Sequence, residues 1–349
     1  MKKSLIALAV LGAFAGTASA QTNVTVYGVV DAGIAYTNNG NPAGKTWSEN
    51  SGMQSGSRLG FKGSEDLGGG MSAIFTLENG FNVDDGTMGQ GNRLFGRQAW
   101  VGLHGNFGTV KLGRQESVLY NALLAVDPFK INLAGNAQKV FGYGVYASDP
   151  LSRTDNTVSY ATPNINGLTG TVTYGFGEQA GDNSANSSAA AAAAYVNGPV
   201  NVQFAYQKSN TAALNSQISG ALGQANADIK TAFIGGTYDF GMVKAHLAYA
   251  DTRFDLTGND VKDSNWLVGL SAPVGAQGAV LASYVRNDVK DLSSAKSDQY
   301  ALGYTYALSK RTNLYTSYSY LKNDSNVALN AFAAGESVRL FNVGVRHSF

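Results

Sequence analysis

The chain of 349 residues contains no cysteine, only six prolines and only three histidines. Without cysteine it can form neither a disulfide nor a thiolate metal site, so its stability must come from elsewhere. After Gln21 no apolar run approaches the length of about 18 residues that a membrane-spanning helix needs. Positive and negative charges nearly balance, which indicates no nucleic-acid partner. The chain is instead rich in glycine (43) and tyrosine (18), a composition typical of an exported all-β protein.

Residues 1–20 have the features of a secretory signal peptide. Two lysines precede a nearly unbroken apolar run from Leu5 to Ala15, and Ala18-Ser19-Ala20 provides a small-residue cleavage site before Gln21. A buried N-terminal helix is the alternative, but it does not explain the basic start and the small-residue end together. The predicted mature chain, 21–349, has 23 basic and 24 acidic residues and therefore a formal charge of −1.

Several segments alternate between apolar and polar residues over the roughly 9 to 11 positions that a tilted strand needs to cross a bilayer. In 168–176, for example, Leu168, Val172 and Tyr174 share one face, and threonines occupy the other. A soluble β-sandwich would also alternate. However, aromatic residues gather near segment ends, and the polar faces carry Thr, Asn, Gln and Gly in place of Lys and Glu. Together with the signal peptide, this pattern favours a transmembrane β-barrel.

The connections between these segments alternate in length. Seven short links alternate with eight longer ones and together join sixteen strands. This arrangement predicts an antiparallel transmembrane β-barrel with short periplasmic turns, long external loops and periplasmic termini. A barrel of this size is wide enough for an aqueous channel. The segments 189–194 and 278–287 alternate poorly, so the predicted number of strands could differ by one hairpin. The short links are 64–70, 105–108, 163–167, 197–199, 239–241, 273–275 and 308–312, and the longer ones are 38–54, 83–92, 116–153, 177–189, 209–228, 252–264, 289–297 and 323–336.

The third long connection, 116–153, is the longest segment without alternation. A structureless loop of this size inside a compact domain is usually functional. It carries apolar anchors, including Leu119, Leu123 and Phe129, and few charges. We therefore predict that it folds back into the barrel and forms a constriction.

The last segment, 337–349, alternates up to the C-terminus. It resembles the terminal strand that the barrel-assembly machinery recognises in bacterial outer-membrane proteins. The residues predicted to share one face of this strand are Phe341, Val343, Val345, His347 and Phe349.

With five further segments, this ending resembles the Gram-negative porin family, the trimeric general porins of beta-proteobacteria. The resemblance covers essentially the whole mature chain. The sequence departs from the family pattern at two places: Ser348 stands where many relatives have a basic residue, and Val-Asp-Pro-Phe at 126–129 stands where related loops often have Pro-Glu-Phe-Gly. The second departure leaves undecided which residues form the acidic side of the pore. The further segments are VTVYGVVDAGIAY (24–36), SRLGFKGSEDLGGG (57–70), GRQAWVGLHGNFGTVKLGRQ (96–115), RTDNTVSYATPNINGL (153–168) and LSKRTNLYTSYSYLKN (308–323).

This resemblance implies a homotrimeric, water-filled pore in the outer membrane, surrounded by outer-membrane lipid and lipopolysaccharide. It implies passage of ions and small hydrophilic solutes, an inward-folded third loop, and neither catalysis nor a cofactor.

Physical arguments select the residues of the predicted pore wall. Alternation places Arg58 and Lys62 on the lumen face. A lipid-facing arginine near the membrane midplane costs about 2 to 4 kcal/mol, so we expect Arg97 to point inward and Trp100 outward, at a trimer interface. Lys111 and Arg114 are three residues apart and cannot share a strand face, and the pattern does not choose between them.

Charged rings set the ion preference of a pore through their field, and we expect a weak anion preference here. The alternative for each charge is a structural ion pair that braces the loop against the wall. The predicted basic wall is Arg58, Lys62, Arg97, Arg114 and Arg153; the predicted loop acids are Glu116 and Asp127; and the further lumen acids are Asp31 and Glu78.

Two rival functions are an outer-membrane hydrolase and an adhesin or purely structural barrel. A hydrolase needs a nucleophile and a base, but no serine or acid arrangement accompanies His104, His246 or His347. Steady single-channel conductance would separate a porin from an adhesin. No spacing typical of metal ligands or phosphate loops is present, so the sequence predicts no enzyme, cofactor or metal site.

Overall fold

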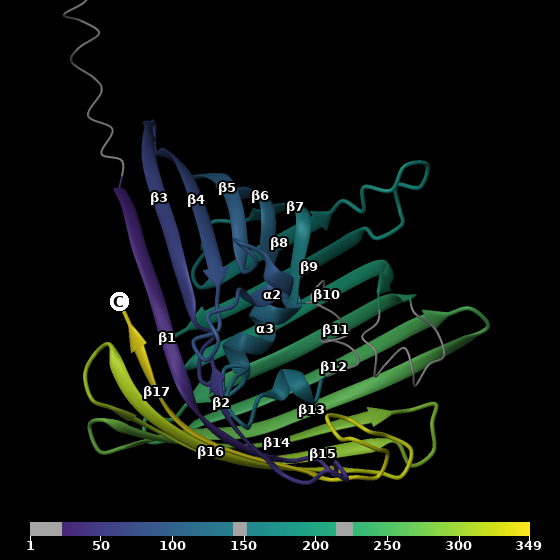
Figure 1. The fold of residues 1–349 in the computed structure, drawn as a ribbon. Helices are drawn as coiled ribbons and strands as arrows, with labels where there is room; N and C mark the ends of the chain where they lie inside the picture. Colours follow the sequence, from purple (N-terminus) through teal and green to yellow (C-terminus); the bar gives the residue numbers. More distant parts are fainter. Residues whose placement is uncertain (1–22, 142–151, 214–225) are drawn as a thin grey trace, which may run out of the picture.

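The computed structural model describes residues 23–141, 152–213 and 226–349, and the predicted signal peptide lies outside these ranges. Among the residues it describes, no helix is long and apolar enough to cross a membrane. The strands form one antiparallel sheet that curls into a closed barrel (Figure 1).

Seventeen strand segments and three short helices make up the described fold. The strands are β1 (Asn23–Asn38), β2 (Thr46–Ser51), β3 (Arg58–Gly68), β4 (Met71–Gly80), β5 (Gln98–Gly105), β6 (Gly108–Glu116), β7 (Arg153–Ala161), β8 (Leu168–Gly175), β9 (Ser188–Asn197), β10 (Val200–Ala213), β11 (Asn226–Asp239), β12 (Lys244–Leu256), β13 (Asn259–Val274), β14 (Gly278–Val289), β15 (Lys296–Ala307), β16 (Thr312–Asn323) and β17 (Val338–Ser348); the helices are α2 (Gly89–Asn92), α3 (Val118–Val126) and the 3-10 turn η1 (Ala137–Lys139).

The barrel closes between its first and last strands. β1 pairs with β17 from Val29 opposite Ser348 to Asn38 opposite Arg339. On its other edge, β1 pairs with β3 along its first half and with β2 along its second half. β2 and β3 are therefore two parts of one barrel strand, interrupted at 52–57, and the seventeen segments form the predicted sixteen strands.

Several predicted loop boundaries were wrong. Residues 46–51 of the expected loop 38–54 form β2, and the expected loop 252–264 is almost entirely strand. There β12 and β13 pair up to Leu256 opposite Asn259, and Gly258 takes the positive φ of +97° that a tight turn requires. These segments carry many charges because the paired strands extend beyond the apolar belt. The weakly alternating segments 189–194 and 278–287 are strands, in β9 and β14.

The interior of the barrel contains an apolar core. Helix α3 lies inside and contacts β9 to β12 (Figure 1). Its Leu119 and Leu123 are fully buried and pack in one cluster with Phe233 of β11 and Ala205 of β10. Burying a leucine side chain contributes about 1.5 to 3 kcal/mol. The apolar anchors of the loop therefore hold it against the inner wall.

Candidate functional site

The loop between β6 and β7 crosses the lumen and is held on several walls. It starts at Ser117, whose side chain accepts a hydrogen bond from the Tyr120 backbone N–H and caps α3. At the end of α3, the Val126 carbonyl accepts a hydrogen bond of 2.7 Å from the His246 ring in β12. Farther on, the Ala134 N–H donates to Ser317 Oγ in β16 at 2.9 Å. A loop attached to both β12 and β16 spans the barrel, while its role as a constriction stays a prediction.

Beside this loop lies a cavity of 1270 Å³. Wall residues and loop residues both line it, so its cross-section depends on the loop. We call it the main cavity. Five basic and three acidic side chains are among its lining residues: Arg58, Arg97, Lys130, Lys244, Arg346, Glu78, Asp127 and Asp239.

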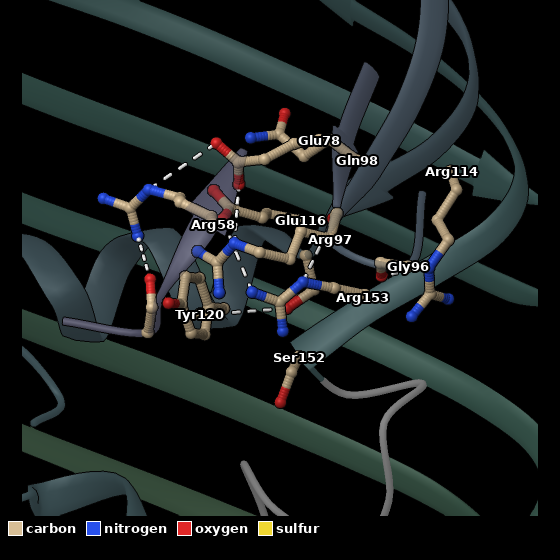
Figure 2. A network of polar contacts seen from close by, with 12 residues as sticks. Arg58, Glu78, Gly96, Arg97, Gln98, Arg114, Glu116, Tyr120, Ser152 and Arg153 are labelled. Atoms are coloured by element: carbon tan, nitrogen blue, oxygen red, sulfur yellow. Dashed lines mark hydrogen bonds and ion pairs between the residues drawn. The ribbon is translucent and has the colours of Figure 1, made fainter. Parts of the chain in front are cut away.

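Three predicted wall arginines meet two predicted acids beside this cavity (Figure 2). Glu78 accepts a hydrogen bond of 2.6 Å from Arg97 Nε and lies 3.7 Å from Arg58 Nε. Arg153 lies 3.7 Å from Glu116 and donates from Nε to the Arg97 carbonyl at 3.1 Å. The predicted residues thus gather in one arginine cluster, which contains ion pairs as well as a net positive charge.

The Arg153 guanidinium also lies 5.3 Å from the centre of the Tyr120 ring on α3. A cation–π contact of this kind contributes about 0.5 to 2 kcal/mol. The cluster therefore braces the loop against the wall, and its Arg58, Arg97 and Glu78 also line the main cavity.

The other two predicted wall residues, Lys62 and Arg114, lie away from the arginine cluster, and neither lines the main cavity. Lys62 is exposed, and its ammonium lies 5.3 Å from the centre of the Tyr27 ring. Arg114 donates from NH1 to Asp155 at 2.6 Å, and Asp155 also binds Arg93 at 2.7 Å. This group connects the loop after β4 to β7, so the placement of Arg114 in the constriction wall was wrong. A register shift between Gly113 and Gln115 separates Arg114 from the alternation that carries Lys111.

Asp127 does not present an acidic face to the pore. Its side chain borders the cavity but is only 2% exposed. The carboxylate accepts hydrogen bonds from the backbone N–H groups of Phe129, Ile131 and Ala137 at 2.8 to 3.2 Å. Burial raises the pKa of Asp127 to about 6, against the opposite effect of these donors. The exposed charge on this turn is Lys130, so the placement of Asp127 as an acid facing the pore was wrong.

Asp31 is also structural, contrary to its prediction as a lumen acid. It is fully buried. Its carboxylate accepts hydrogen bonds from the backbone N–H groups of Gln54 and Ser55 at 2.8 and 2.6 Å, and from the Tyr315 hydroxyl at 2.6 Å. These bonds hold the 52–57 interruption turned into the lumen, where Gln54, Ser55 and Gly56 line the main cavity.

Trp100 faces the lumen, and its assignment to a trimer interface was wrong. Its Nε1–H donates to Gln98 at 2.8 Å, and the Lys111 ammonium lies 4.3 Å from the ring centre. The outward residues of β5 are Val101 (58% exposed) and Leu103 (45%). The inward direction of Arg97 did not determine the face of Trp100, because Arg97 precedes β5 and its alternation starts only at Gln98.

Comparison with known proteins agrees with this geometry. The family model described as Gram-negative porin matches residues 7–326. The chain belongs to the Gram-negative porin family. An outer membrane porin protein of Bordetella pertussis is 36% identical over 400 residues, and outer membrane porin protein 32 of Delftia acidovorans is 36% identical over 364; each alignment covers 100% of both chains. We therefore assign this porin to the outer membrane.

Solved structures agree as well. An anion-selective porin from Comamonas acidovorans has 33% identity and a TM-score of 0.80, covering 94% of this porin and 100% of that chain. An outer membrane protein of Vibrio cholerae in a trimer form matches with a TM-score of 0.70 and covers 94% of this porin and 99% of that chain. Its 18% identity supports the fold alone.

The residues predicted to share one face of the C-terminal strand do share it, and this face points outward. Val343, Val345 and Phe349 are each 43 to 48% exposed, His347 is exposed too, and Phe341 is partly exposed. The backbone N–H and carbonyl of Phe349 each pair with Gly28 at 3.1 Å. The last residue thus completes the barrel seam, while its role as an assembly signal stays a prediction.

Sequence reasoning missed several residues of the porin's main cavity. Lys244 and Arg346 lie on β12 and β17, where alternation alone could have placed them inside. Gln54 and Ser55 had a weaker signal: the glycines and serines of 51–57, including Gly52 with its positive φ of +68°, break the strand pattern. That this break turns inward depends on its bonds to Asp31.

Proposed function

We propose that this porin is a water-filled diffusion channel for ions and small hydrophilic solutes, with a weak preference for anions. The observation that carries this proposal is the arginine cluster at the main cavity. Arg58 and Arg97 line this cavity and share the Glu78 carboxylate, and the Arg153–Glu116 pair lies beside them, so that three arginines accompany two carboxylates. The relative from Comamonas acidovorans is named as anion-selective, which agrees with this charge pattern.

The acids of the main cavity are all engaged with the protein itself. Glu78 pairs with two arginines, Asp239 lies 3.3 Å from Lys244, and Asp127 binds backbone N–H groups. Lys130 and Arg346 have no ion pair within 4 Å in the described ranges of the chain. The field in the main cavity is therefore positive, and a field of this kind favours anions without binding them tightly.

Planar-bilayer recordings under a salt gradient test this proposal. Replacing Arg58 and Arg97 together by glutamine should lower the anion-to-cation permeability ratio several-fold at 0.1 M salt, where screening acts over about 10 Å. The effect should fade toward 1 M. The matched control replaces Arg93 and Arg114, which bind Asp155 away from the main cavity, and should leave the ratio unchanged.

Two results would contradict the proposal. If purified, folded protein produces no steady conductance, the chain does not form a channel. If replacing Arg58 and Arg97 leaves the reversal potential unchanged at 0.1 M salt, the arginine cluster only braces the loop.

We also propose that the porin is a homotrimer. The support is the trimer form of the Vibrio cholerae neighbour and the exposed apolar face of β5, with Val101 and Leu103. A face of this kind suits either lipid or another subunit, so the gel test described in the Discussion decides between them.

We further propose that the outer wall binds the phosphates of lipopolysaccharide. Lys208 lies opposite Lys230, Lys230 opposite Arg253, and Arg253 opposite Lys262. Like charges directly opposite one another destabilise a sheet, and of these four only Lys230 has an ion pair in the described ranges, with Asp255. Replacing Arg253 and Lys262 by glutamine should reduce the lipopolysaccharide that copurifies; unchanged retention would exclude this surface.

A further inference from the structure

Helix α3 divides the lumen into two unequal spaces. Tyr120 and Leu124 line the main cavity on one side of the helix. Asn121 and Ala122 line a second cavity of 250 Å³ on the other side, against β5, β6 and β7 to β10. We call this second space the side chamber. It is distinct from the main cavity and shares no lining residue with it.

The far wall of the side chamber is built from small side chains. Three threonines of β8 line it, and Thr169 and Thr171 lie directly opposite Ala194 and Ala192 of β9. These alanines belong to the segment 189–194, which alternates poorly in the sequence. Small residues on two adjacent strands leave space that larger side chains would fill. At about 30 Å³ per water molecule, the chamber has room for about eight waters, or for a small solute with part of its hydration shell.

The basic residue of this chamber is Lys111. Its ammonium lies 4.3 Å from the centre of the Trp100 ring, and no carboxylate lies within ion-pair distance of it in the described parts of the chain. Glu116 also lines the chamber, but its ion pair is with Arg153. Among the described residues Lys111 therefore has no direct ion pair, and Glu116 acts on it only at longer range. The rest of the chamber is lined mainly by hydroxyls, amides and small apolar groups.

We propose that the side chamber is a binding site for a small monovalent anion, such as a halide or a short carboxylate. Lys111 supplies the charge, the hydroxyls of Thr169 and Thr171 can donate hydrogen bonds, and the indole of Trp100 forms one wall. An anion there forms an ion pair with the Lys111 ammonium and fills the space between α3 and the wall of the side chamber. The site does not depend on the ion preference of the main cavity.

Trp100 makes the site directly measurable. The chain has three tryptophans, and the other two, Trp47 and Trp266, are 65% and 52% exposed on the outer wall. Replacing both by phenylalanine leaves Trp100 as the sole indole fluorophore. Iodide, which is both a small anion and a quencher, is then titrated at constant ionic strength against fluoride.

We expect saturable quenching by iodide, and competition by chloride and acetate. Lys111→Met should weaken the apparent iodide affinity at least fivefold, whereas quenching by neutral acrylamide should stay the same. Lys111→Arg should restore the saturable phase. The matched control is Lys62→Met, which removes a lysine that also lies over an aromatic ring but outside the side chamber, and it should have no effect.

Linear iodide quenching that is equal in the parent and Lys111→Met proteins would overturn the proposal. So would an absence of acrylamide quenching, because the chamber would then be closed to solutes. Replacing Arg58 and Arg97 by glutamine should leave the iodide titration unchanged. Failure of the proposed anion preference and failure of this site would therefore be distinguishable.

Discussion

Replacing Glu78 by glutamine should strengthen the anion preference of the channel. Glu78 is the only carboxylate that contacts both Arg58 and Arg97 among the described residues, at 3.7 and 2.6 Å. Glutamine has nearly the same shape and keeps an oxygen that can accept the Arg97 hydrogen bond. The substitution therefore removes one negative charge from the main cavity and leaves two guanidinium groups uncompensated.

The magnitude follows from Coulomb's law. An ion passing about 5 Å from the carboxylate interacts with it by about 0.8 kcal/mol in bulk water. Screening over about 10 Å at 0.1 M salt reduces this to about 0.5 kcal/mol. Because a negative charge attracts cations and repels anions, its loss shifts the difference between them by about 1 kcal/mol, or about fivefold in the permeability ratio. At 1 M, where the screening length is about 3 Å, the change should fall below about twofold.

The assay is the reversal potential of single channels in planar bilayers, measured at both salt concentrations. Glu65→Gln is the matched control, because Glu65 is exposed near the end of the neighbouring strand β3 and lies outside the main cavity. Unheated gels should show that both variants retain the folded barrel. An unchanged ratio for Glu78→Gln at 0.1 M would refute the reasoning, since the charge would then lie outside the field that permeating ions experience.

Three further predictions concern the loop, the seam and the outer wall. Burial raises the pKa of Asp127 to about 6 from 3.8, so about 3 kcal/mol of loop stability is present below pH about 4 and is lost as the pH rises through about 6. Hydrogen exchange of the loop amides, corrected for intrinsic rates, should therefore accelerate as the pH rises over that window. Asp127→Asn should abolish this pH dependence. Deleting Phe349, which removes its two backbone bonds to Gly28, should lower the outer-membrane level several-fold on immunoblots; normal insertion would exclude the terminal residue as an assembly determinant. Val101→Lys should loosen the trimer on unheated gels and Trp100→Lys should not; the opposite order would place the subunit contact elsewhere.

The barrel itself could be predicted from the sequence because its determinants are local. A period of two, a segment length that matches a bilayer and turn residues between segments are all readable without knowing which strands pair. The same reasoning placed Arg58 on the lumen face and found the inward loop from its apolar anchors. It missed the extent of β12 and β13, because charged residues continue a paired strand beyond the membrane as readily as they form a loop.

The direction of single side chains at the site was decided by the tertiary structure. Asp127 and Asp31 are acids that sequence patterns place beside a pore, yet each turns to backbone N–H groups that the folded loop or the 52–57 segment brings within reach. Trp100 faces inward because β5 begins one residue after Arg97. Alternation holds only within a continuous strand, and a buried carboxylate binds whichever donors surround it. Where strands start, shift register or break is set by contacts between distant segments, so those contacts determine which charges an ion meets.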